Sequence, residues 1–183
     1  LNLNELIYLK KKLSNKNLYV QCALHQRFRP ISIATKNTIK KNLIGKVYFV
    51  NIIHRKFRSI PKQSYVFSNK KFSGGGPLID LGTHYFDLIA WIFDFPKIQS
   101  GNCRVFSGIF KKRKMKRFLP FKFYNNEEAA IGSINLKNNI LVNFELSYVS
   151  NTRDESTKIE IFGNKGSIVW PQNEFYILKK NKL

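Results

Sequence analysis

The segment Gly74–His84 holds the residues of this chain whose types and spacing could do proton-transfer chemistry. It reads Gly-Gly-Gly-Pro-Leu-Ile-Asp-Leu-Gly-Thr-His and runs directly into an apolar stretch over 85–93. Asp80 and His84 are four residues apart, so a helix that has begun by Asp80 places both side chains on one face, one turn apart. A carboxylate beside an imidazole at a glycine-rich turn can move protons. The segment is therefore a candidate active site.

The same residues also have a plainer explanation. Asp80 could cap the helix, and His84 could be a core histidine whose hydrogen bonds are satisfied. The three glycines allow a sharp turn and a close approach of another molecule, whichever explanation holds. Spacing alone favours the plainer explanation, because helix caps are common and catalytic pairs are rare.

Hydrophobic periodicity predicts the elements in front of this segment. Helical patterns over 4–12 and 31–42 flank the apolar stretch 18–24, which is typical of a buried strand. A helix, a strand and a crossover helix are typical of the end of an α/β unit. A strand over 46–54 and a polar, basic stretch over 55–73 come next.

The remainder of the chain has strand patterns after one predicted helix over 81–93. Strands are expected at 98–109, 128–136, 140–148, 158–162, 167–170 and 175–178. Turn signals at Lys137-Asn138-Asn139 and at Gly163–Gly166 predict hairpins. Because consecutive hairpins build antiparallel sheets, the predicted fold class is α+β, an open, mostly antiparallel sheet with helices on one face.

Length and composition limit the class of protein. The 183 residues suit one domain, or one domain and a fragment of another, and 43% hydrophobic residues can bury a sizeable core. No apolar run approaches the ~20 residues of a membrane span, and the polar start has no basic signal-peptide region, so a cytoplasmic protein is expected. The start without Met suggests part of a longer chain.

The cysteines and histidines indicate no metal centre. Cys22 and Cys103 match no metal spacing, and three scattered histidines complete no ligand set. Both cysteines are expected to be buried free thiols, the default in a reducing cytoplasm.

The strongest compositional signal is a net charge of +21, from 32 Lys and Arg against 11 Asp and Glu. Such a charge usually suggests nucleic acid or an anionic surface. The chain is also rich in Lys, Asn, Ile and Phe and poor in Ala, a bias typical of AT-rich genomes. Such a bias raises the net charge without any selection for binding an anionic partner. The dense cluster Lys111–Arg117 is predicted to be a solvated loop, with a site for an anionic ligand or nucleic acid as the alternative. Nucleic-acid binding is disfavoured, because the aromatic-interleaved basic motifs of common RNA folds are absent.

An ordered series of motifs resembles the Gfo/Idh/MocA oxidoreductases. The series is Arg27-Phe28-Arg29-Pro30, Leu43–Val47, Gly74–Asp87, Trp91 and Ile161–Ile168, and it covers nearly the whole chain. The resemblance implies an N-terminal Rossmann domain that binds NAD(P) and a C-terminal, dihydrodipicolinate-reductase-like domain on an open antiparallel sheet. It also implies oxidation or reduction of a sugar, nucleotide-sugar or cyclitol hydroxyl.

The resemblance assigns roles within the glycine-rich segment. In this family, a Lys of a Glu-Lys-Pro motif acts with the Asp and His of an Asp-x-x-x-His motif, which Asp80 and His84 match. His84 is then the acid/base, and Asp80 orients its ring or hydrogen-bonds the substrate. Gly75 and Gly76 would let the backbone approach the substrate.

Weaker candidates lie outside this segment, and each has a plain alternative. Arg27, at a predicted strand end, could contact the cofactor or be a surface arginine. Arg153, with Asn151, could contact the substrate or belong to a polar loop. Asp87 could support His84 or be an ordinary helix residue. Trp91 is expected in the core, and His25 and His54 are expected to be structural or exposed.

The chain departs from the family at its N-terminal end. It contains no Gly-x-Gly-x-x-Gly and no Glu-Lys-Pro. Residues 1–30 are therefore predicted to be the C-terminal remnant of a Rossmann domain, and residues 31–183 a substrate and oligomerisation domain. The cofactor, NAD or NADP, would be held mainly elsewhere, because the helix N-terminus that binds its pyrophosphate is absent.

Two functions from different classes follow. The first is the catalytic and substrate domain of an NAD(P)-dependent oxidoreductase, which acts on a carbohydrate-like substrate and forms a homo-oligomer through the sheet face. The second is a truncated, non-catalytic remnant of the fold that serves as an oligomerisation or interaction module.

Overall fold

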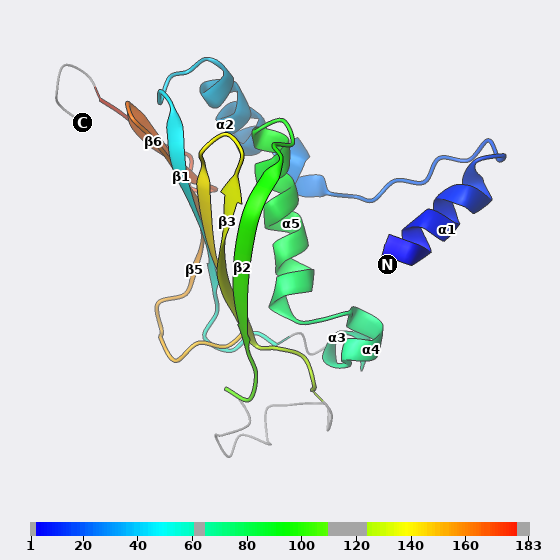
Figure 1. The fold of residues 1–183 in the computed structure, drawn as a ribbon. Coiled ribbons are helices and arrows are strands. Elements are labelled where there is room, and N and C mark those ends of the chain that lie inside the picture. The colour runs from blue at the N-terminus through cyan, green and yellow to red at the C-terminus, as the bar shows by residue number, and fades with distance from the viewer. Residues whose placement is uncertain (1–2, 61–64, 110–123, 179–183) are drawn as a thin grey trace.

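A long helix lies against one face of a seven-stranded sheet (Figure 1). The computed structural model describes residues 3–60, 65–109 and 124–178, so the basic cluster Lys111–Arg117 lies outside the described residues. The helices are α1 (Leu3–Leu13), the 3-10 helix η1 (His25–Phe28), α2 (Pro30–Lys40), α3 (Tyr65–Ser68), α4 (Lys70–Ser73) and α5 (Pro77–Ile92). The strands are β1 (Val47–Arg55), β2 (Ile98–Phe106), β3 (Ala129–Leu136), β4 (Leu141–Ser147), β5 (Ser156–Gly163), β6 (Gly166–Trp170) and β7 (Glu174–Ile177).

The sheet is open and mostly antiparallel, as predicted. Its strand order is β2-β3-β4-β1-β5-β6-β7, with β2 and β7 at the two edges. β1 and β4 are the one parallel pair among the described strands, and the other neighbours are antiparallel. The two predicted hairpins, β3–β4 and β5–β6, are both present. In the first turn, Asn139 adopts a positive φ of 62°, which asparagine tolerates better than most residues.

The core forms where α5 packs on the centre of the sheet. Leu88, Ile89 and Ile92 are spaced to lie on one face of α5, and all three are buried. They share a core cluster with inward-facing residues of β1, β4 and β5, and along β4 these residues alternate with polar neighbours. The buried members of these strands are Val47, Val50, Ile52, Val142, Phe144, Leu146, Ile159 and Ile161.

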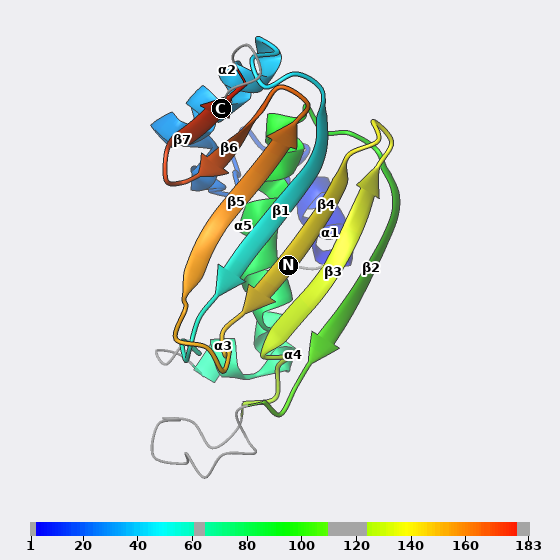
Figure 2. The same cartoon turned by 90° about the vertical axis from the view of Figure 1, so that its left-hand side faces the viewer.

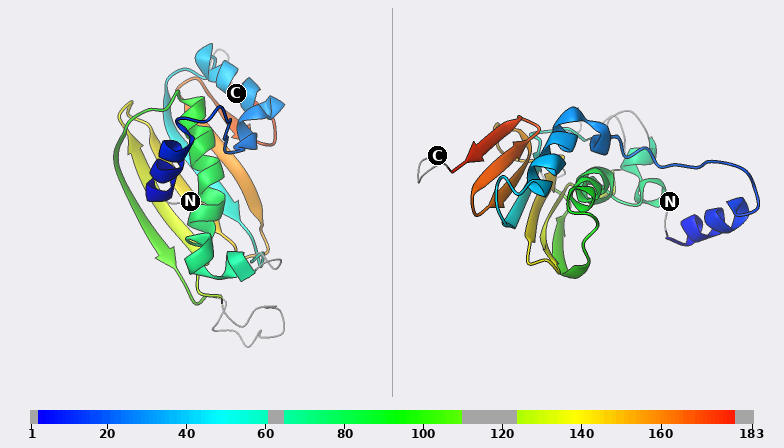
Figure 3. Two further views of the ribbon diagram at one scale, coloured as in Figure 1. Left: turned by 90° about the vertical axis from the view of Figure 1, so that its right-hand side faces the viewer. Right: turned by 90° about the horizontal axis from the view of Figure 1, so that it is seen from above.

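Helices α2 and α5 lie on the same face of the sheet, which confirms the predicted arrangement (Figure 3). The N–H of buried Trp170 in β6 donates to the Ser32 hydroxyl of α2 at 3.0 Å, which ties α2 to the last strands. No described helix covers the opposite face. Within the described residues, no helix is both long and apolar enough to cross a membrane.

The prediction of a strand over 18–24 is wrong. These residues form no strand, and Leu18, Tyr19 and Val20 are 62%, 102% and 63% exposed. A strand needs a neighbour for its backbone N–H and C=O groups, and the local apolar pattern cannot show whether one is present. No described segment pairs with 18–24. Together with α1, which has no buried residue, the stretch stands apart from the sheet in Figure 1.

Both cysteines are exposed, which contradicts the expectation of buried thiols. Cys22 lies in the unpaired stretch just described. Cys103 lies on the edge strand β2, none of whose residues is buried. Each cysteine is exposed because no further described element covers the segment on which it lies.

A hydrogen bond under α5 joins the helix to β1. The Nδ1 atom of His54 and the hydroxyl of Tyr85 lie 2.7 Å apart. Burial, helped by the nearby Lys56 ammonium, lowers the pKa of His54 from 6.5 to about 4, and burial raises the pKa of Tyr85 to about 12. At neutral pH the pair is therefore a neutral imidazole and a neutral phenol, which is the form that a partly buried site favours.

The core packing predicts how two leucines on β4 differ in importance. Leu146→Ala should lower the free energy of unfolding by about 2–5 kcal/mol, because the side chain is fully buried and leaves a cavity. Leu141→Ala is the matched control on the same strand, and as a 37% exposed residue it should cost less than about 1 kcal/mol. Urea unfolding followed by circular dichroism measures both, and equal losses would contradict the packing described.

The His54 environment predicts a pH dependence of stability. The unfolded chain protonates this histidine near pH 6.5 and the folded chain only near pH 4, so the unfolded state binds more protons between these values. Stability should therefore fall as the pH decreases from about 6.5 to about 4. His54→Gln should flatten that slope, whereas exposed His25→Gln should retain it. Urea unfolding across this interval provides the test, and an unchanged slope in His54→Gln would refute the assignment.

Candidate active site

The candidate residues gather at the N-terminal half of α5, at one end of the sheet. In Figure 2 the arrowheads of β1 and β4 point toward this end, where α3 and α4 also lie. In open α/β sheets, ligands bind outside the carboxyl ends of parallel strands, and β1 and β4 form such a pair here. The location therefore suits a ligand site.

The three glycines let the turn before α5 pack on the residue Glu127. Gly74 caps α4 with a positive φ of 80°. A Cβ added to Gly76 would lie 2.1 Å from the carbonyl oxygen of Glu127, and one added to Gly75 would lie 2.8 Å from Ile79. A side chain at Gly75 or Gly76 would therefore clash with neighbouring residues of the same chain, so packing alone explains why both positions are glycine. Their role in substrate binding stays a prediction.

Glu127 is a buried residue that sequence reasoning missed. Its carboxylate accepts a hydrogen bond of 3.3 Å from the N–H of Leu78, in the first turn of α5. It satisfies one of the free N–H groups at the helix start and places a negative charge at the positive end of the helix dipole. Glu127 lies two residues before β3, and the local sequence around it does not indicate this contact.

Asp80 is not the helix cap. The N-cap is Gly76, and α5 begins at Pro77, four residues before the predicted start, so Asp80 lies inside the first turn. Proline is favoured at the first helical position because its missing N–H needs no partner there. The Oδ2 atom of Asp80 accepts a hydrogen bond from the hydroxyl of Tyr148. Tyr148 is 5% exposed, and its burial and the bond to Asp80 raise the pKa of the phenol well above its usual range.

His84 follows one turn later and is not a satisfied core histidine. Its Nδ1 atom is buried and has no hydrogen-bond partner among the described residues. Its ring lies against that of His25, with the ring centroids 5.7 Å apart and the planes tilted by 59°. Because unpaired buried polar atoms are costly and rare, this nitrogen points to a partner that the described residues do not supply. The acid/base role of His84 stays a prediction.

An ion pair holds the segment that carries His25 against α5. Arg27 Nε donates to Asp87 Oδ2 at 2.7 Å, and Arg27 Nη2 makes a second hydrogen bond to Asp87 Oδ1. The guanidinium also lies 5.3 Å from the centre of the Phe95 ring. Asp87, one turn beyond His84, thus supports it indirectly by anchoring η1. The cofactor role of Arg27 stays a prediction, and its guanidinium is turned toward Asp87.

The remaining candidates lie away from this group. Arg153 and Asn151 are exposed in the connection between β4 and β5, and the substrate role of Arg153 stays a prediction. Trp91 packs against the core cluster, as expected. His54 and Tyr148 are additions to the site: His54 occupies an inward position on β1, and Tyr148 is buried directly after β4. A polar side chain on an apolar strand face was the signal that could have found His54.

The described residues contain neither a metal centre nor a glycine-rich phosphate cradle. No group of three or more His, Cys, Asp or Glu within the described residues could hold a metal ion. The Nδ1 of His84 is buried without a partner among the described residues, and a role for it beside a nicotinamide ring stays a prediction. The chain has no Gly-x-Gly-x-x-Gly, so the pyrophosphate would have to bind outside these 183 residues.

Comparison with known proteins gives a family and a close curated relative. The family model of the GFO/IDH/MocA C-terminal domain matches residues 33–169. D-glucoside 3-dehydrogenase of Escherichia coli (strain K12) is 27% identical over 151 residues, which is 80% of this chain and 43% of the relative.

Solved structures show the same fold at low sequence identity. Levoglucosan dehydrogenase in complex with NADH superposes with a TM-score of 0.70 at 19% identity, over 91% of this chain and 43% of that chain. The WlbA dehydrogenase from Bordetella pertussis, in complex with NADH and UDP-GlcNAcA, superposes with a TM-score of 0.62 at 15% identity, over 85% and 45%.

This chain spans less than half the length of these relatives. The family model nevertheless matches well over half of the chain, from α2 to β6. The ordered motifs, the open mostly antiparallel sheet and this match agree, so the chain belongs to the GFO/IDH/MocA family and contains its C-terminal domain.

Proposed function

We propose that this chain is the catalytic and substrate domain of an NAD(P)-dependent oxidoreductase that acts on a hydroxyl of a sugar, nucleotide-sugar or cyclitol. The observation that carries the proposal is the buried, unpaired Nδ1 of His84, one helical turn after Asp80. The names of the relatives support the substrate class, because a glucoside and levoglucosan are both sugars.

The chain's own residues would manage the proton of the reaction. When a carbinol carbon loses a hydride, the hydroxyl proton must leave as well, and an imidazole with a reference pKa of about 6.5 can accept it near neutral pH. His84 takes this role, and in the reverse direction it returns the proton to the carbonyl oxygen. The bound nicotinamide supplies the hydride acceptor or donor.

Asp80 would orient the reacting groups. Tyr148 engages Oδ2 of the carboxylate, and no hydrogen bond to Oδ1 is recorded among the described residues. Oδ1 is then available for a substrate hydroxyl or for the imidazolium that forms when His84 accepts its proton. A carboxylate in either position favours the charged state of the reaction.

The cofactor, NAD or NADP, would be bound mainly by a preceding Rossmann domain. We propose that residues 1–30 are the end of that domain and residues 31–183 the substrate domain. The exposed apolar residues of α1 and of 18–20 support this division, since their side chains have no covering element among the described residues. A lysine from a Glu-Lys-Pro motif in the missing part would complete the catalytic group.

A non-catalytic module is the second candidate function. The specific observation in its favour is the uncovered face of the sheet, whose charged and polar side chains are paired across neighbouring strands. In that case the fold would serve in assembly alone. The DNA that precedes the codon for Leu1 separates the two candidates, because a Gly-x-Gly-x-x-Gly and a Glu-Lys-Pro sequence should both be encoded there if the enzyme is complete.

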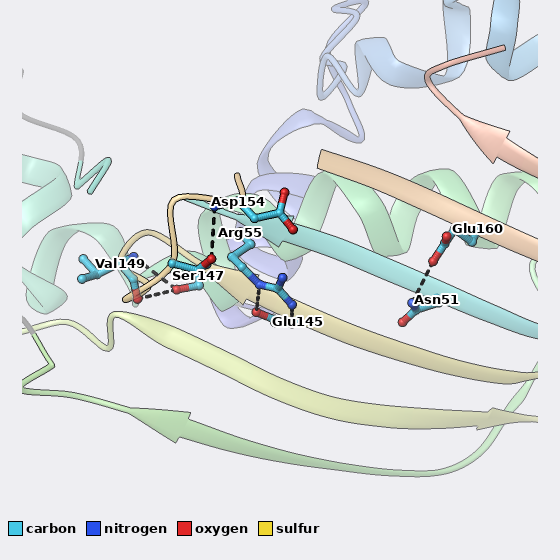
Figure 4. A network of polar contacts seen from close by, with 8 residues as sticks. Asn51, Arg55, Glu145, Ser147, Val149, Asp154 and Glu160 are labelled. Atoms are coloured by element: carbon cyan, nitrogen blue, oxygen red, sulfur yellow. Dashed lines mark hydrogen bonds and ion pairs between the residues drawn. The ribbon is translucent and has the colours of Figure 1, made fainter. Parts of the chain in front are cut away.

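We also propose a homo-oligomer through the uncovered face of the sheet. Figure 4 shows side chains on this face that are paired across neighbouring strands. Arg55 donates to Glu145 with two hydrogen bonds of 2.7 and 2.6 Å, and Asn51 donates to Glu160 at 3.0 Å. Paired charges cost less to bury than isolated ones, so such a face suits contact with a second copy.

Turnover should depend on His84 in the protein that contains this chain. His84→Gln should lower kcat/KM toward sugars by at least ~10²-fold, because general acid/base catalysis is lost. Thr83→Ala, an exposed neighbour on α5, is the control and should retain activity. NAD(P)H absorbance measures turnover over a panel of glucosides and cyclitols. Turnover of His84→Gln near the wild-type value would return this residue to a structural role.

The oligomer predicts different effects for two exposed residues of similar size. Ile131, 48% exposed on β3, pairs in register with Glu145 on the uncovered face. Ile131→Arg should dissociate the oligomer, because it places an unpaired charge in the interface. Leu43→Arg, at a 47% exposed residue beyond α2, should not. Light scattering after size-exclusion chromatography gives the mass, and a monomeric wild type would rule out this interface.

A further inference from the structure

Tyr148 is held in place by backbone contacts on both sides. It lies directly after β4, and its N–H donates to the carbonyl of Glu128 at 3.0 Å. Its own carbonyl accepts a hydrogen bond of 2.8 Å from the N–H of Ser59. With the ring 5% exposed as well, the direction of the side chain is determined by the sheet and its connections.

The phenol of Tyr148 acts as a hydrogen-bond donor to Asp80. Its hydroxyl donates to Oδ2, which joins the end of β4 to the first turn of α5. Because burial and the neighbouring carboxylate keep the phenol protonated, the donor is present throughout the physiological pH range. An aspartate in a first helical turn otherwise has several staggered rotamers, and this bond selects one of them.

A second buried tyrosine in the same cluster does not contact Asp80. Tyr124 is also 5% exposed and packs with Tyr148. Its hydroxyl donates to the backbone carbonyl of Glu127 at 2.8 Å. The two tyrosines therefore match in burial and in the number of recorded hydroxyl hydrogen bonds, and they differ in the partner that each one holds.

We propose that Tyr148 is the positioning residue for Asp80. It fixes the carboxylate by Oδ2 and so directs Oδ1 toward the reacting groups near His84. The inference rests on the proposed function, since it assigns Tyr148 a role through Asp80 in that reaction. Preorganised geometry of this kind contributes to rate because small displacements of a catalytic group slow the reaction.

The contact can be tested on the 183-residue chain without any activity measurement. In urea unfolding, Tyr148→Phe should raise the unfolding equilibrium constant by roughly 5-fold in the wild-type background, because one buried hydrogen bond is lost. In an Asp80→Ala background the same change should have an effect of less than about 2-fold. Tyr124→Phe should have equal effects in the two backgrounds. Additive effects of Tyr148→Phe and Asp80→Ala would overturn the contact and the inference with it.

The positioning role is tested by the same cycle in kinetics of the protein that contains this chain. Tyr148→Phe should lower kcat for sugar oxidation by about 10-fold with a smaller change in KM, and this loss should vanish when Asp80 is alanine. Tyr124→Phe, matched in burial, should leave kcat within about 2-fold. A similar loss in Tyr124→Phe, or a loss from Tyr148→Phe that persists without Asp80, would overturn the positioning role. A wild type without turnover would instead refute the proposed function, and the positioning role would fall with it, whatever the unfolding cycle shows.

Discussion

The packing of α5 on the sheet is the constraint on which the rest of the structure depends. Leu88, Ile89 and Ile92 bury the apolar face of the helix against the central strands. Full burial of such side chains stabilises each by about 1.5–3 kcal/mol, compared with about 0.5–1.5 kcal/mol for a typical neutral hydrogen bond. Since Asp80, His84 and Asp87 all lie on α5, this apolar face determines where the functional side chains can reach.

Polar contacts along α5 follow one another turn by turn, and each partner comes from a different element. Tyr148, after β4, reaches Asp80 in the first turn, and His54 of β1 reaches Tyr85 in the second. Arg27 of η1 then binds Asp87. In this series, the Nδ1 of His84 is the buried side-chain atom of α5 that lacks a recorded partner among the described residues. The proposed acid/base role of His84 rests on this one unsatisfied nitrogen within an otherwise hydrogen-bonded surround.

The elements of the sheet domain were predictable because each has a strong local pattern. A run rich in apolar, strand-favouring residues predicted β1 to within a residue at each end, and turn residues predicted the hairpin at Asn139. The start of α5 was placed too late because the turn glycines obscured Pro77, which in fact occupies the first helical position. The stretch 18–24 was misassigned as a strand. An apolar run indicates that its side chains favour burial, but it does not show whether a neighbouring strand is present to pair with its backbone.

The amino-acid sequence by itself determined the fold class, the family resemblance and the joint location of Asp80 and His84 on one helix face. The shared helix face follows from short-range periodicity, because residues four apart on a helix lie on the same side. The fold class follows from the sequence of local strand and turn patterns, and the resemblance follows from the order of the motifs. Only the tertiary structure decided that Asp80 is bound by Tyr148, that Glu127 supports the glycine turn, and that the Nδ1 of His84 has no recorded partner. These contacts join residues 49 or more positions apart, or depend on what lies around a residue, and no local pattern specifies which side chains the folded sheet brings together.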